Sequence, residues 1–95
     1  MEIGKVLITN TIQDLIVKNK IRVQDLVKSC IKMELNDFGD ICEEDREYQW
    51  NCLYKYGDTG DQMIGVYYSK GIKYWVINAD SSIGRCTTIM LPDEY

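Results

Sequence analysis

The sequence predicts an α+β fold with the element order β-α-α-α-β-β-β. Three observations lead to this prediction: a short β-branched segment near the start, apolar residues at helical spacing in the middle, and a hairpin-connected meander in the second half. We expect an antiparallel sheet with the helices packed on one face. The chain has 95 residues, which is enough for one core, so residues 1–95 are predicted to form a single domain.

The first two elements are short. Residues 5–9 are rich in β-branched side chains and follow a glycine, which predicts the first strand. Thr11 comes next with Asp14 three residues later, a spacing that resembles a capping box in which Asp replaces the usual Glu. A short helix is therefore expected over residues 11–18.

Two further helices are predicted from spacing and charge. Five apolar residues fall at i, i+3, i+4, i+7 and i+8 and are expected to face the core: Val23, Leu26, Val27, Cys30 and Ile31. This helix should end near Leu35. A third helix is expected to begin at Asp40, a good N-cap residue, and to run to about Tyr56.

The second half is predicted to be a meander. Its three strands are expected at residues 62–68, 72–77 and 86–91. The tight turn between the first two contains Gly71, which can adopt a positive φ angle. Residues 79–85 are mostly polar and are expected to form a loop.

Negative charge is concentrated in one segment. The chain has a formal net charge of −4, yet residues 34–50 alone hold seven acidic groups and one arginine. Such a chain is repelled by nucleic-acid phosphates, so direct nucleic-acid binding is not expected. The acidic segment is the first candidate site, a partner-binding face that imitates phosphates: Asp37, Asp40, Glu43, Glu44, Asp45 and Glu47. Two alternatives stay open, a divalent-metal site and a solvated helix start that compensates the helix dipole.

Enzymatic chemistry is not expected. The chain has no histidine, so the commonest general base and metal ligand is missing, and it contains no glycine-rich phosphate-binding loop. Four cysteines occur without a CxxC pair and are predicted to be reduced thiols that fill small apolar spaces. We therefore predict no catalytic residue, no cofactor and no metal. No apolar run is long enough to span a membrane, and without a signal segment we expect a cytoplasmic protein.

A second candidate site combines the aromatic hairpin with the polar segment that follows it. These residues would bind a small polar or phosphorylated ligand, with the arginine as its cation: Tyr74, Trp75, Asp80, Arg85 and Thr88. A structural interpretation stays open for each part. The aromatic rings can pack across strands, and Asp80 and Arg85 can brace a loop.

Residues 34–95 resemble a family of small, mostly uncharacterised bacterial proteins sometimes called "plasmid-related protein". The resemblance rests on the block Asp37-Phe38-Gly39-Asp40, the strand Lys73-Tyr74-Trp75-Val76-Ile77 and the end Thr87-Thr88-Ile89-Met90-Leu91-Pro92-Asp93-Glu94-Tyr95. The loop at residues 79–85 is longer than the family's, so Arg85 is displaced from the family position. The resemblance implies a setting on plasmids, phages or conjugative elements and implies no activity.

Acidity and this setting together suggest a hypothesis. The chain would be a mobile-element or phage-encoded inhibitor of a host defence system, similar to an anti-CRISPR protein. It would bind a host defence protein or nucleoprotein complex through its acidic face, as a monomer or small homo-oligomer. A second hypothesis is a sponge for a signalling nucleotide, and a third is an antitoxin-like interaction module.

Overall fold

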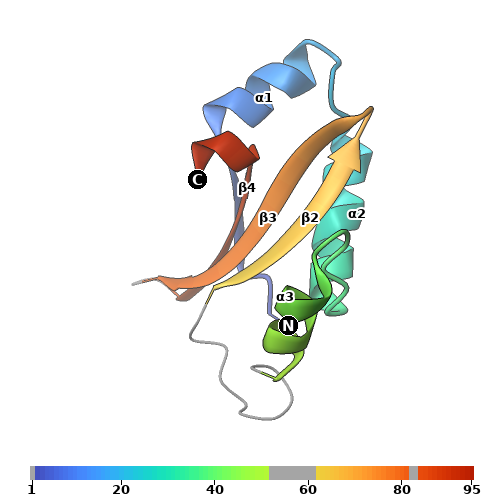
Figure 1. The fold of residues 1–95 in the computed structure, drawn as a ribbon. Coiled ribbons are helices and arrows are strands. Elements are labelled where there is room, and N and C mark those ends of the chain that lie inside the picture. The colour runs from blue at the N-terminus through green and yellow to red at the C-terminus, as the bar shows by residue number, and fades with distance from the viewer. Residues whose placement is uncertain (1, 52–61, 82–83) are drawn as a thin grey trace.

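The computed structural model describes residues 2–51, 62–81 and 84–95, and in these the predicted α+β class and element order are confirmed (Figure 1). The elements follow the order β1 (Lys5–Ile8), α1 (Asn10–Val17), α2 (Val23–Glu34), α3 (Glu43–Trp50), β2 (Met63–Ser69), β3 (Ile72–Ser81), β4 (Gly84–Met90) and the short 3-10 helix η2 (Pro92–Glu94).

The four strands form one sheet in the order β1-β4-β3-β2. β2, β3 and β4 are antiparallel neighbours, as the meander predicted. β1, the first strand of the chain, lies on the side of β4 away from β3 and runs parallel to β4, with Lys5 opposite Cys86 and Ile8 opposite Ile89. The sheet is therefore mostly antiparallel, as predicted, with one parallel pair that joins the two ends of the chain.

The β2–β3 turn is the predicted one. Lys70 and Gly71 both have positive φ angles, 49° and 80°, as a two-residue hairpin turn requires. The prediction of a loop at residues 79–85 is wrong. β3 continues to Ser81 and β4 begins at Gly84, with Asp80 directly opposite Arg85.

Helix α2 lies on β2 and β3 and completes the core. In Figure 1 it lies behind the sheet, while η2 lies on the opposite side. The buried core cluster consists of Ile3, Ile12, Ile21, Leu26, Met33, Phe38, Met63, Tyr67, Tyr74, Val76 and Ile89. The predicted core-facing stripe of α2 is only partly correct. Leu26 is buried and Cys30 packs on the core, whereas Val23, Val27 and Ile31 are each about half exposed.

Two predicted helix starts are also wrong. The N-cap of α1 is Thr9, whose hydroxyl accepts the Ile12 N–H at 3.3 Å, and Thr11 lies inside the helix. The N-cap of α3 is Cys42 rather than Asp40, because the Asp40 backbone is used elsewhere. The predicted continuation of this third helix toward Tyr56 lies outside the described residues.

The segment before α3 covers the open edge of β2. Val66 donates its N–H to the Phe38 carbonyl at 2.9 Å and accepts the Asp40 N–H at 2.8 Å, an isolated parallel bridge. Gly39 sits between them with φ +70°, and a Cβ there would lie 2.1 Å from the Val66 carbonyl oxygen. Only glycine allows this approach. The segment thereby protects an edge that would otherwise offer unpaired backbone groups.

The C-terminal turn is attached to α1 through Glu94. Its carboxylate accepts the Leu91 N–H at 2.9 Å and the Thr9 hydroxyl at 3.0 Å. The Leu91 hydrogen bond is the main reason that the pKa of Glu94 is lowered from its ordinary value. A lowered pKa in the folded state means that this contribution is present above the unfolded pKa and is lost as the pH falls through the folded pKa.

We therefore expect Glu94→Gln to reduce Tm at neutral pH, and we expect the difference to shrink as the pH falls from neutral through the folded-state pKa of Glu94. Thermal melts of both proteins across this range measure the difference. Asp93→Asn, an exposed change on the same turn, is the control. A Tm difference that persists unchanged at acid pH would contradict the assignment.

Candidate partner-binding site

The six acidic residues predicted as a partner surface lie together and are all exposed. Four are on α3, and Asp37 and Asp40 lie in the segment that precedes it. Asp40 is not helical, so the predicted acidic segment is formed by α3 and the residues that precede it. We call these six residues the acidic face: Asp37, Asp40, Glu43, Glu44, Asp45 and Glu47.

One side chain fastens α3 to the sheet. Gln49, the buried residue of α3, accepts the Ile64 N–H at 2.6 Å and donates to the Ile64 carbonyl at 3.2 Å. Its amide thus pairs with β2 as a neighbouring strand would. Arg46 adds a hydrogen bond to the Gly39 carbonyl at 3.3 Å. The acidic helix is held against β2 by these polar contacts, and the rest of its side chains are left at the surface.

Gln49→Leu should release α3 from the sheet, because Leu cannot replace either hydrogen bond to Ile64 and leaves two partly buried backbone groups without their partner. We expect a loss of about 1–3 kcal/mol in the free energy of unfolding and faster hydrogen exchange at the Ile64 amide. Gln13→Leu, at an exposed glutamine of α1, is the matched control. Unchanged protection at Ile64 would show that Gln49 does not anchor the helix.

The outward side of α3 combines carboxylates with aromatic rings. At about 100° per residue, Glu44 and Glu47 point away from Gln49, so they point away from the sheet. Tyr48 and Trp50 flank them and are 56% and 54% exposed. Carboxylates beside aromatic faces suit a guanidinium group, which can pair with one and stack on the other. The site predicted from the sequence did not include these two rings, because the burial of Gln49, which turns them outward, is not visible in the sequence.

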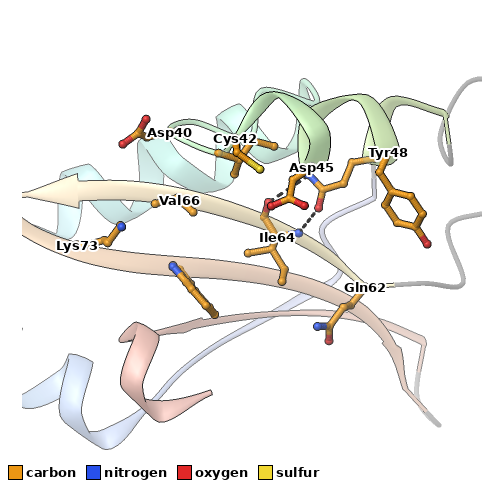
Figure 2. Close-up of a pocket in the computed structure, with 11 residues that line it drawn as sticks. Asp40, Cys42, Asp45, Tyr48, Gln62, Ile64, Val66 and Lys73 are labelled. Atoms are coloured by element: carbon orange, nitrogen blue, oxygen red, sulfur yellow. Dashed lines mark hydrogen bonds between the residues drawn. The ribbon is translucent and has the colours of Figure 1, made fainter.

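A groove of about 590 Å³ runs beside the acidic face, between α3 and the strands β2 and β3. Figure 2 shows Asp45 and Tyr48 on its α3 wall and Ile64 and Val66 on its β2 wall. Lys73 and Trp75 reach it from β3. The groove therefore offers carboxylates at its rim and apolar surface within it.

Two polar side chains that line this groove, Asp40 and Trp75, differ in their hydrogen bonding. The Tyr68 hydroxyl donates to the Asp40 carboxylate at 2.9 Å, and this hydrogen bond is the main cause of the raised pKa of Tyr68. It holds Asp40 against β2. The indole N–H of Trp75 is buried and has no hydrogen-bond partner among the described residues.

The structure does not bring the second predicted set together. Tyr74 is fully buried, and its hydroxyl bonds to the Ser29 hydroxyl and donates to the Asp25 carbonyl at 3.1 Å. Strand alternation and the β3–β4 register place Trp75 and Thr88 on the opposite face of the sheet from Tyr74, Asp80 and Arg85. One ligand cannot contact all five from a single side.

Arg85 is occupied by neighbours on its own face. Its guanidinium lies 3.2 Å from the Asp80 carboxylate, and its side chain is only 8% exposed. It also donates to the Asn78 side-chain oxygen, at 2.9 Å from Nε. Asn78 is fully buried and donates in turn to the Thr87 hydroxyl at 2.9 Å and to the Glu2 carbonyl at 3.0 Å. This network ties the start of the chain to the sheet, so the loop-bracing interpretation of Asp80 and Arg85 fits their contacts.

The remaining predicted features are simple to place. Cys30 packs on the core as a small apolar filler, and burial raises the pKa of its thiol. Cys42 is exposed at the start of α3, so it is not a filler. No group of three or more Cys, Asp or Glu side chains in the described residues is placed to hold a metal ion. Among the same residues no helix has the length and apolar character needed to cross a membrane.

Comparisons of the chain with protein-family models, with curated protein sequences and with solved structures gave no match.

Proposed function

We propose that this protein is a phage- or mobile-element-encoded inhibitor of a host defence system, similar in role to an anti-CRISPR protein. It binds a host defence protein or nucleoprotein complex through the acidic face and competes with nucleic acid for a basic surface. The observation that carries this proposal is the acidic face itself. Six exposed carboxylates lie on one anchored helix and its lead-in, with exposed aromatic rings beside them. The mobile-element setting rests on the sequence resemblance.

Charge placement supports a protein partner over direct nucleic-acid binding. The carboxylates would repel phosphates and would attract the lysines and arginines that bind phosphates. The carboxylates on the outward side of α3 are available for this role. Glu43 pairs loosely with Arg46 at 3.8 Å, whereas no ion pair is recorded for Glu44 or Glu47 within the described residues. A helix start that only compensates its dipole does not require Glu47, which lies beyond the first turn.

The nucleotide-sponge alternative has weaker support, because its five residues are divided between two faces and Arg85 is already paired. An antitoxin-like module would use the same acidic face, and the identity of the bound partner separates it from a defence inhibitor.

The proposal is tested in bacteria that carry defined CRISPR or restriction systems. Expression of the wild-type chain should raise phage plating efficiency on at least one such strain. Glu44→Gln with Glu47→Gln removes two charges without changing side-chain size and should lose most of this effect. Asp14→Asn with Asp93→Asn removes two exposed charges elsewhere and should retain it. No rise in plating on any defence strain would reject the defence-inhibitor role.

A further inference from the structure

Within residues 2–51, 62–81 and 84–95, the helix-covered face of the sheet is open on the β1 side. α2 lies on β2 and β3, and β1 is exposed along its whole length. Between them runs a groove of about 890 Å³. Its walls are almost entirely apolar and come mainly from β1, β4 and α2: Val6, Ile8, Ile89, Val23, Leu26, Val27, Cys30 and Ile31.

α2 carries a second apolar side that turns toward this groove. Leu26 and Met33 are buried against the sheet. Val23, Val27 and Ile31 form a stripe centred about 100° from Leu26, and they are 50%, 53% and 52% exposed. The outermost side of α2 is polar. The apolar stripe therefore points sideways along the sheet, which is where a neighbouring helix in the same layer would lie.

The helix layer on this face of the sheet has room for one more helix beside α2. Four strands at about 4.8 Å spacing can carry two helices side by side, since packed helices lie about 8–10 Å apart. α2 occupies one of these positions. α1 closes one end of the groove through Ile16 and leaves the second position over β1 and β4 open.

We propose that this groove binds an amphipathic helix of about three turns from another protein, matching the length of α2. The two acidic residues that line the groove set its direction. Glu34 is at the end of α2, and Glu2 precedes β1 at the same end of the groove. The N-terminus of the incoming helix, or lysines near it, would be favoured there, so the bound helix runs antiparallel to α2. This surface is separate from the acidic face.

A second copy of this chain fits the groove less well. Its α2 is already seated on its own sheet, so the side it could turn to another sheet carries Gln24, Lys28 and Lys32. If two copies paired through their β1 edges, the grooves would also stay uncovered, because α2 of each copy lies over β2 and β3. The two helices would then be more than about 20 Å apart, and their apolar stripes would stay uncovered.

The test is a selection of 16-residue random peptides displayed on phage, using the wild-type chain as bait. Val27→Glu alters the groove, and Val17→Glu places the same change at a 77% exposed position of α1 outside it. We expect enriched peptides with apolar residues at i, i+3 or i+4, and i+7. Their affinity should fall at least about tenfold on Val27→Glu and stay unchanged on Val17→Glu.

Four outcomes would overturn the proposal. They are no enriched peptide, enriched peptides with strand-like alternation that pair with β1, and equal binding by Val27→Glu. The fourth is a wild-type dimer in light scattering that Val27→Glu converts to a monomer, because this would make a second copy the occupant.

Discussion

Tyr74→Ala should remove a large share of the stability of this domain. Tyr74 is fully buried between α2 and the sheet, and its ring lies 6.1 Å from that of Tyr67. Removing a buried aromatic side chain costs about 3–5 kcal/mol, a large share of the stability of a small domain. Urea denaturation followed by circular dichroism measures the loss.

Two controls separate burial from other causes. Tyr74→Phe keeps the ring and removes only the hydroxyl contacts with Ser29 and Asp25, so it should cost about 1 kcal/mol. Tyr68→Ala is the same truncation at a 49% exposed position and should cost much less than Tyr74→Ala. A Tyr74→Ala protein with the wild-type midpoint would show that this residue is outside the core and would restore its candidacy as a ligand contact.

Asn78→Leu should be the most destabilising change of a polar residue, by about 3–5 kcal/mol. The substitution removes the Asn78 oxygen that accepts from Arg85 and the donor that holds the Glu2 carbonyl. Arg85 is 8% exposed at its side chain, so it has little access to water in compensation. The free energy of unfolding from urea titrations gives the size of the effect.

The double variant Asn78→Leu with Arg85→Leu tests the cause. If the cost comes mainly from a buried guanidinium with too few partners, removing the guanidinium as well should recover part of the loss. Thr87→Val, which removes one hydroxyl of the same network, should cost about 1–2 kcal/mol. Strictly additive losses for Asn78 and Arg85 would show that the two side chains act independently.

The sequence predicted those helices and turns that are decided by residues close to one another along the chain. The helix α2 and the Lys70-Gly71 turn are confirmed because spacing and φ preference decide them within a few residues. The parallel pairing of β1 with β4 could not be predicted in this way, because it joins residues about 80 positions apart. The polar residues 79–85 predict a loop, whereas the strand observed there also buries Asn78, and a buried Asn78 needs distant partners for its amide.

The two candidate sites differed in how well the sequence predicted them. The exposure of the acidic face was predictable, since six carboxylates in eleven residues cannot be buried without partners. The placement of Asp40 on β2 rather than in the helix depends on Gly39 and Val66, which no local rule connects. The separation of Tyr74 from Trp75 was predictable from strand alternation alone, and applying that rule to the whole set would have divided it.

The central claim is that the acidic face displaces nucleic acid from a basic surface of a defence complex. Fluorescence anisotropy of labelled nucleic acid bound to the complex identified by plating measures this directly. We predict that the wild-type chain releases the nucleic acid and that Asp14→Asn with Asp93→Asn does so equally. Glu44→Gln with Glu47→Gln should need at least about ten times more protein. Nucleic acid that stays bound at saturating wild-type chain, or equal competition by the Glu44 and Glu47 variant, would contradict the account.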